Sequence, residues 1–213
     1  MSRLAWIAIA YAAGTLPSPY LVALAGRRRD VIAQMRRDES PGDAHFLVVS
    51  KMSRALGILA IVLDMVKGFV PALVARATDQ DAVTLAWIGL AAVAGHSYPP
   101  YFRRAGGRGL TTAAGVTLVL TPKAMVATGI ISLAGTVARK GGFGTSIGFA
   151  LLPAFVAIFG YTGALVAMAG GITALIAIRR MEGARDDRRA GVPVGRILLG
   201  RLLFDLPRGK HDL

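Results

Sequence analysis

The stretch ALGILAIVLDMVKGFVPALVA, residues 55–75, decides the class of protein to which this chain belongs. It is an apolar run with two charged side chains, and its length matches the roughly 20 residues that an α-helix needs to cross a bilayer. The whole chain has 213 residues, is 54% hydrophobic and has a mean hydropathy of +0.55. Six more apolar runs cover residues 4–26, 82–99, 110–121, 124–138, 146–159 and 162–178. We therefore predict an all-α membrane protein with about seven transmembrane helices, some of them short or broken.

Positive charge is concentrated in alternate connections between these runs. Of the 25 lysines and arginines, 21 lie in residues 27–54, 103–108, 139–142 and 179–213. Because Lys and Arg are enriched in cytoplasmic loops, this pattern predicts an N-terminus outside and a C-terminus in the cytoplasm. Cytoplasmic loops account for the net charge of +13 without a nucleic-acid partner.

The same pattern indicates how the chain is organised. We expect residues 1–178 to form a multi-pass membrane domain that begins with a retained helix, not a removed signal peptide. Residues 27–54 are expected to form a polar loop, and residues 179–213 a basic cytoplasmic tail with a short interfacial helix near 194–202. The chain has no cysteine, and its three histidines lack the spacing of metal ligands.

Two of the apolar runs contain unusual polar features. In GTLPSPYLV, residues 14–22, two prolines forbid a regular helix, so the first run should be broken. The break either lines a site or is satisfied by nearby hydroxyl groups. In LDMVKGFVPAL, residues 63–73, Asp64 and Lys67 are three positions apart and share a helix face. They form either part of a functional site or a structural ion pair.

A third stretch, GHSYPPYFRRAGGRGLTTAAG at residues 95–115, joins two apolar runs. Pro99 and Pro100 end the preceding helix. The glycines allow a ligand to approach backbone N–H groups, and the next helix adds the positive end of its dipole. Arg108 offers a guanidinium suited to phosphate oxygens. The stretch predicts a cytoplasmic phosphate site; the alternative is a flexible arginine-rich turn with interfacial aromatic residues.

Taken together, the three stretches resemble the bacterial acyl-phosphate-dependent glycerol-3-phosphate acyltransferases, the PlsY family. The family has a Gly-Ser-Ile-Pro-like turn, similar to GTLPSPYLV, and an Asp-x-x-Lys-Gly element, similar to DMVKG. Its Gly-His-x-x-Pro…Phe…Gly-Gly-Lys-Gly-Val-Ala-Thr stretch is similar to GHSYPPYFRRAGGRGLTTAAG. The resemblance covers about residues 10–120.

The resemblance implies an activity in phospholipid synthesis. Family members transfer a fatty acyl group from acyl phosphate to the 1-hydroxyl of glycerol 3-phosphate, which gives lysophosphatidic acid and phosphate. They need no metal or coenzyme A. We accordingly expect no cofactor, and acyl phosphate, glycerol 3-phosphate and membrane lipids as partners. The expected location is the bacterial inner membrane, with the active face toward the cytoplasm; the oligomeric state is not implied.

The resemblance also implies site residues. Thr15, His96 and Arg108 are the candidate catalytic residues, with Thr15 in place of a family serine and Arg108 in place of a lysine. The candidates for substrate binding lie in or near the motifs and are Ser18, Lys67, Arg103, Arg104, Gly106, Gly107, Gly109, Thr111 and Arg180.

Two parts of the family pattern differ in this chain. The first-loop pattern Gly-Ser-Gly-Asn…Gly-Ala-Thr-Asn is largely replaced by DESPGDAHFLVVS, residues 38–50. At the end of the last run, Arg180 stands where the family has a histidine and Gly183 where it has an asparagine. A permanent cation cannot serve as acid or base. The alternative function is therefore a family-like membrane protein without transferase activity that binds anionic lipid or phosphate compounds.

Overall fold

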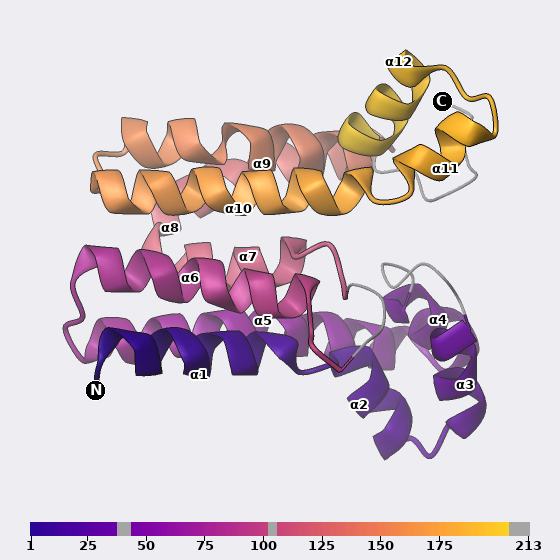
Figure 1. Cartoon of the computed structure of the whole chain (residues 1–213), viewed down its shortest axis with the longest axis horizontal. Coiled ribbons are helices and arrows are strands. Elements are labelled where there is room, and N and C mark those ends of the chain that lie inside the picture. Colours follow the sequence, from indigo (N-terminus) through magenta and orange to yellow (C-terminus); the bar gives the residue numbers. More distant parts are fainter. Residues whose placement is uncertain (38–43, 102–105, 205–213) are drawn as a thin grey trace. The chain divides into compact units, whose positions relative to one another are not determined.

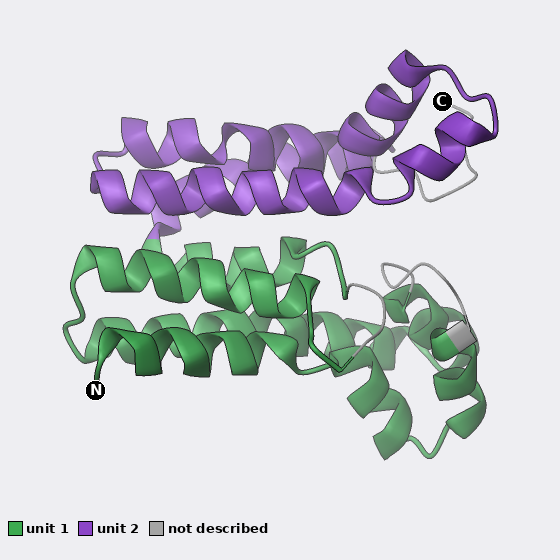
Figure 2. Cartoon of the chain, viewed as in Figure 1, with its two compact units in different colours: residues 1–120 green, residues 121–213 purple. Residues whose placement is uncertain are grey.

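The computed structural model describes residues 1–37, 44–101 and 106–204, and these contain helices and no strand (Figure 1). The predicted all-α class is therefore confirmed for the described residues. The chain divides into two compact units, residues 1–120 and 121–213 (Figure 2). A membrane domain over residues 1–178 followed by a separate tail stays a prediction.

Each unit is a set of helices joined by short connections. The first unit contains α1 (Arg3–Thr15), α2 (Ser18–Ala25), α3 (Arg29–Arg37), α4 (Ala44–Lys51), α5 (Arg54–Ala77), α6 (Ala82–Ser97) and α7 (Leu110–Leu120). The second unit contains α8 (Pro122–Val137), α9 (Gly141–Ile158), α10 (Gly163–Met181), α11 (Ala184–Arg189), α12 (Val194–Leu198) and the π-helix η2 (Leu199–Leu203).

Each of the seven predicted apolar runs is helical in the structure. Among the described residues, three helices are long and apolar enough to cross a membrane: α5, α9 and the helical stretch Gly163–Arg189, which begins with α10. A fourth crossing results if α1 and α2, which are bent by 51°, form one broken span. Helices α6, α7 and α8 are apolar but shorter. Seven crossings and the orientation of the termini stay predictions.

The break predicted in the first run lies at Leu16 and Pro17. Helix α1 ends at Thr15, whose hydroxyl donates a hydrogen bond to the carbonyl of Ala12 at 2.7 Å. Pro19 lies in the first turn of α2, where the missing N–H of a proline is tolerated. The break leaves the carbonyl of Leu16 accessible to a side chain from another helix.

Helices of the first unit pack closely through glycines. A Cβ added to Gly14 of α1 would overlap the carbonyl oxygen of Ala92 in α6, and one added to Gly115 of α7 would overlap that of Met65 in α5. Small residues allow such close packing of helices inside a bilayer. Helix α5 also exposes apolar side chains, as expected for a lipid-facing surface: Ile58, Leu59, Ile61, Val62, Val66, Val70, Leu73 and Val74.

The region 27–54 is not the polar loop that the sequence predicts. It contains α3 and α4, and Val31 and Met35, one turn apart on α3, are buried. They belong to an apolar cluster of residues from α2 to α5: Val22, Ala23, Val31, Met35, Ala44, Leu47, Val48 and Ala60. The loop prediction failed because the charged residues of α3 outnumber the few apolar ones that form its buried face.

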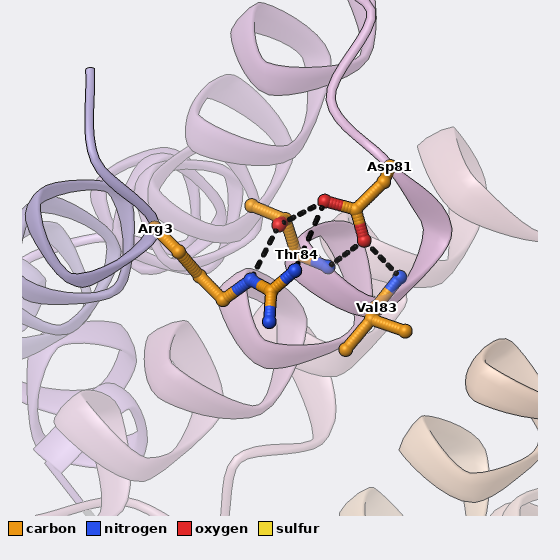
Figure 3. A network of polar contacts seen from close by, with 4 residues as sticks. All are labelled: Arg3, Asp81, Val83 and Thr84. Atoms are coloured by element: carbon orange, nitrogen blue, oxygen red, sulfur yellow. Dashed lines mark hydrogen bonds and ion pairs between the residues drawn. The ribbon is translucent and has the colours of Figure 1, made fainter.

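A polar network joins the start of α1 to the start of α6 (Figure 3). Asp81 caps α6 by accepting hydrogen bonds from the N–H groups of Val83 and Thr84, at 3.0 and 3.1 Å. The hydroxyl of Thr84 donates to the Asp81 carboxylate at 2.5 Å, and Arg3 donates to Thr84 at 2.9 Å. These hydrogen bonds, that of the Thr84 hydroxyl first, lower the pKa of Asp81 to about 2.

In the second unit, buried arginines attach the C-terminal helices to α9 and α10. Arg180 donates hydrogen bonds to the hydroxyl of Ser146 and, at 2.7 Å, to the carbonyl of Leu202. Arg201 donates to the carboxylate of Asp187 at 2.7 Å and to the carbonyl of Glu182 at 2.6 Å. The sequence correctly predicts a short helix near 194–202, which is α12 followed by η2. Its contact with anionic lipid stays a prediction.

Candidate active site

A buried carboxylate, that of Asp64 in α5, is the centre of the polar cluster in the first unit. The Asp64 side chain has no exposed surface. One of its oxygens, Oδ1, lies 2.7 Å from Nζ of Lys67 and 3.8 Å from Nδ1 of His96. The other, Oδ2, lies 2.8 Å from Nε2 of His45. Three nitrogens from three helices therefore face one carboxylate, and the predicted pairing of Asp64 with Lys67 is confirmed.

Lys67 connects this cluster to the broken first span. Its ammonium donates a hydrogen bond to the carbonyl of Leu16 at 2.8 Å while it pairs with Asp64. An ammonium group has three donors, so it can satisfy both acceptors in an otherwise apolar helix. The break between α1 and α2 is thereby fixed to the middle of α5.

His96 connects the cluster to the glycine loop. A Cβ added to Gly107 would overlap the imidazole Nε2 of His96, and one added to Gly106 would overlap the carbonyl oxygen of the same residue. The N–H of Gly106 donates to the carbonyl of Ser97 at 2.7 Å. Gly109 has a φ of +85°, a left-handed conformation that favours glycine. The loop thus requires glycine because it lies directly on the end of α6.

The first turn of α7 contacts the backbone of Asp64. The hydroxyl of Thr112 donates to the backbone carbonyl of Asp64 at 3.0 Å, and Thr112 is fully buried. Thr111 is half-buried at the N-terminal end of this helix, and Arg108 is partly exposed in the loop that precedes it. The N-terminus of α7, with its positive dipole end, therefore lies close to the cluster.

The structure brings together only part of the predicted site. Lys67 and His96 lie at the Asp64 carboxylate, and Gly106 and Gly107 lie against His96. Thr111 and Gly109 lie at the start of α7, which follows the loop. Ser18 is buried at the start of α2, and the Thr15 hydroxyl is bonded within its own helix. Arg103 and Arg104 lie outside the described residues, and Arg180 belongs to the second unit.

Sequence reasoning missed His45 and did not include Asp64 among the site residues. His45 is 19 positions from Asp64 in the chain, and only the packing of α4 against α5 brings it to the carboxylate. Its place at the start of a short apolar segment gave no signal of this contact. The spacing of Asp64 and Lys67 did give a signal, because residues three apart share a helix face.

The described parts of the chain contain no group of three or more His, Asp or Glu side chains arranged to hold a metal ion. In the Asp64 cluster, the Lys67 ammonium lies against Oδ1, where a metal ligand would need a free carboxylate oxygen. The cluster is instead suited to hydrogen bonding and proton transfer. Its imidazoles and carboxylate are the side chains most often used for such chemistry.

Comparison with known proteins assigns this chain to a family. The family model for glycerol-3-phosphate acyltransferase matches residues 4–186, most of the chain. The chain belongs to this family. The resemblance seen in the three motifs is therefore confirmed.

Curated members of the glycerol-3-phosphate acyltransferase family match over part of their length. A glycerol-3-phosphate acyltransferase of Pseudomonas syringae pv. syringae (strain B728a) is 37% identical over 127 residues, which are 58% of this chain and 64% of that protein. One of Pseudomonas putida (strain KT2440) is 47% identical over 77 residues, 36% of this chain and 41% of that protein. The aligned part thus spans less than two thirds of either relative.

Solved structures of the family match over nearly the whole chain. A crystal structure of PlsY (YgiH), an integral membrane glycerol 3-phosphate acyltransferase, in its lysophosphatidic acid form has a TM-score of 0.71 and 25% identity. The match covers 93% of this chain and 100% of the PlsY chain. The glycerol 3-phosphate form has a TM-score of 0.71 and 26% identity, and the match covers 89% of this chain and 94% of the PlsY chain. This chain therefore has the integral membrane fold of PlsY.

Proposed function

We propose that this protein is a membrane acyltransferase that moves a fatty acyl group from acyl phosphate to the 1-hydroxyl of glycerol 3-phosphate. The products are lysophosphatidic acid and inorganic phosphate, for phospholipid synthesis. The observation that carries the proposal is the glycine loop of residues 106–109, held against His96 and the Asp64 cluster in a family member. Solved relatives in glycerol 3-phosphate and lysophosphatidic acid forms support the same substrate class.

The arrangement suggests how the reaction is assisted. The N-terminus of α7, with its positive dipole end, and the guanidinium of Arg108, which can exchange partners, are suited to a phosphate group beside the glycine loop. Phosphate is already a good leaving group in an acyl phosphate, so positioning and charge stabilisation supply most of the rate. The acyl chain lies among the apolar helices, while the two phosphate-bearing ends stay at the polar face.

One experiment tests the activity. Purified protein is incubated with acyl phosphate and glycerol 3-phosphate, and phosphate release is measured beside a membrane blank and an active family member. We expect phosphate release that requires both substrates, and no lysophosphatidic acid when acyl-coenzyme A replaces acyl phosphate. Release no greater than in the blank, while the known member is active, would contradict the proposal.

A second candidate function is a family-like protein that binds anionic lipid or phosphate compounds without transferring an acyl group. Arg180 favours this alternative, because it is a permanent cation whose hydrogen bonds to Ser146 and Leu202 fasten the C-terminal segment. Binding of glycerol 3-phosphate without any phosphate release would support it.

The proposed setting is the bacterial inner membrane. We propose seven crossings, counting the broken first span and the short helices α6, α7 and α8, with the N-terminus outside. The concentration of lysine and arginine in residues 27–54, 103–108, 139–142 and 179–213 supports this orientation. It would place the glycine loop and the C-terminal segment on the cytoplasmic side.

A further inference from the structure

The C-terminal helices α11, α12 and η2 form a segment, residues 184–203, that the proposed reaction does not use. The family match ends at residue 186, so most of this segment lies beyond it. The segment follows α10, whose 19 residues are about the length that crosses the hydrocarbon core of a bilayer. Figure 1 shows α11 and α12 at the C-terminal end of α10. The segment therefore begins where a membrane span ends, at the level of the lipid headgroups.

Buried contacts fix the orientation of this segment. Arg201 of η2 donates to the carboxylate of Asp187 in α11 at 2.7 Å, which joins the two ends of the segment. The ring of Phe204 lies against that of Phe143 at the start of α9, with 5.5 Å between the ring centroids. Ile197 of α12 is 3% exposed. Because one side of α12 is buried in this way, the side chains on its other side have a defined outward direction.

The outward side of α12 and the start of η2 carry large apolar side chains. Val194, Leu198 and Leu199 are 51%, 42% and 47% exposed. Positions 194 and 198 are one turn apart and share a helix face. A Cβ added to Gly195 would have no neighbour within 4 Å, so the surface beside this face is also open. Contact of these side chains with water is unfavourable, whereas the boundary between headgroups and acyl chains accommodates them.

Exposed positive charge accompanies the apolar face. Four arginines of the segment are exposed: Arg185, Arg188, Arg189 and Arg196. Asp186 is the only exposed acid within residues 184–203, since Asp187 is buried against Arg201. Guanidinium groups bind phosphate oxygens well, and a helix with an apolar face and such cations typically lies on an anionic membrane. A second copy of this chain would instead bring like charges together.

We propose that the segment from α11 to η2 is a docking surface for anionic phospholipid. The exposed apolar side chains of α12 and η2 insert below the headgroups, and the exposed arginines bind the lipid phosphates. The surface belongs to the second unit alone and lies apart from the Asp64 cluster of the first. The inference therefore goes beyond acyl transfer and does not depend on it.

The first test places a fluorescent label on the apolar face. The chain has no cysteine, so Leu198→Cys can be labelled alone in the full-length protein. The protein is placed in nanodiscs of phosphatidylcholine, with or without phosphatidylglycerol, that contain the same fraction of a lipid with a nitroxide near its headgroup. We expect quenching to be about twofold stronger or more with phosphatidylglycerol, because the anionic surface attracts the arginines. Leu133→Cys, on the exposed side of α8, is the matched control and should be quenched equally in both.

The second test removes charge from the segment. In the labelled protein, the double variant Arg188→Gln, Arg189→Gln should lose roughly fivefold in lipid affinity for each arginine, so that quenching with phosphatidylglycerol falls to the level without it. Salt at about 1 M should have the same effect, because it screens exposed charges. Lys123→Gln removes an exposed cation outside the segment and should leave the preference for phosphatidylglycerol unchanged.

Three results would overturn the inference. Equal quenching of the Leu198→Cys label in the two kinds of nanodisc would show contact without recognition of anionic lipid. A label that soluble iodide quenches freely in both would show that the face stays in water. A label that becomes shielded in detergent as the protein concentration rises would assign the face to a second copy of the chain. Leu199→Cys serves if Leu198→Cys does not fold. None of these readouts needs turnover, so a failure of the acyl-transfer proposal is separately recognised.

Discussion

At the scale of single residues, the Asp64 carboxylate compensates the charge of the Lys67 ammonium inside α5. A charged side chain near the centre of a membrane helix costs about 2.5–3.5 kcal/mol on insertion scales. Asp64 and Lys67 are both buried in α5, and each provides the opposite charge that the other needs. Removing one charge is therefore worse than removing both.

We expect Asp64→Asn to lower the free energy of unfolding by about 3–5 kcal/mol, because it leaves the Lys67 ammonium buried without an anion. The double variant Asp64→Asn, Lys67→Met should recover part of this loss. Chemical unfolding in detergent measures both, with Lys123→Met, at an exposed position, as the control. An equal or larger loss in the double variant would show that the pair does not stabilise by charge compensation.

Gly107 provides a test of the contact between loop and imidazole. Its Cβ in Gly107→Ala would overlap Nε2 of His96, so either the loop or the ring must move. Because a shift of about 1 Å near a site can lower the rate roughly 100-fold, we expect a fall of that order in kcat/KM for glycerol 3-phosphate. Gly129→Ala, with no neighbour within 4 Å of the added Cβ, is the control and should remain active. Equal activity of the two variants would contradict the role of this contact.

The residue scale also shows what sequence alone can predict. The Asp64–Lys67 pair was predictable because a spacing of three fixes both side chains on one helix face. The need for glycine at Gly107 was only partly predictable: the motif indicated a bare backbone, but the cause is the ring of His96. His45 was not predictable, since its contact depends on how α4 packs on α5.

At the scale of elements, hydrogen bonds fix the places where helices begin. The Asp81 carboxylate satisfies two N–H groups at the start of α6 and also accepts from the Thr84 hydroxyl. Arg3 links this cap to the start of α1 (Figure 3). The network therefore aligns two helices of the first unit at the end opposite to the Leu16 break.

The cap predicts how stability depends on pH. The pKa of the Asp81 carboxyl is lowered to about 2, below the value of about 3.9 for an unfolded aspartate, so the folded state favours the ionised carboxylate. The stabilisation should be complete above about pH 4 and lost as the pH falls through about 2. Thermal unfolding of wild type and Asp81→Asn between pH 5 and 2 should show a difference that shrinks toward pH 2. Thr84→Val should shift this loss to higher pH, and a difference independent of pH would contradict the prediction.

Element prediction from sequence was good for apolar helices and poor for amphipathic ones. The helices in all seven apolar runs were predicted correctly, because hydrophobicity over many residues is a strong signal in the sequence. The amphipathic helix α3 was missed because few of its residues are apolar, and α4 was missed because its apolar run is short. The burial of both helices depends on partners elsewhere in the chain. The break at Pro17 was predictable, but its role in presenting the carbonyl of Leu16 to Lys67 was not.

At the scale of the whole molecule, charge distribution is the main evidence for orientation. The chain has no cysteine, so single-cysteine variants report on topology without background labelling. We expect Ala77→Cys, at the exposed end of α5, to react with an impermeant maleimide in intact cells. Lys51→Cys, at the exposed end of α4, should react only after the cells are opened. The reverse pattern would contradict the proposed orientation.

In the second unit, we expect the attachment of the C-terminal segment to depend on Arg201. Arg201 is buried and bonded to Asp187 and to the carbonyl of Glu182, so Arg201→Gln leaves the Asp187 carboxylate poorly compensated. Breaking such a buried pair costs about 3–5 kcal/mol, and we expect the segment from α11 to η2 to detach. Limited proteolysis within residues 184–203 should then be much faster than in wild type. Arg196→Gln, an exposed change, is the control, and equal cleavage of both variants would contradict the docking role.

The contact between Lys67 and Leu16 has a consequence for how related sequences diverge. The ammonium binds a backbone carbonyl, a group that every amino acid supplies. Leu16 is 50% exposed, so its side chain is free to vary. Proline is the exception, because the Leu16 N–H donates to the carbonyl of Ala13. Homologues can thus preserve the contact between the lysine and this carbonyl with different residues at position 16. A sequence comparison, which scores residue types alone, would overlook the contact.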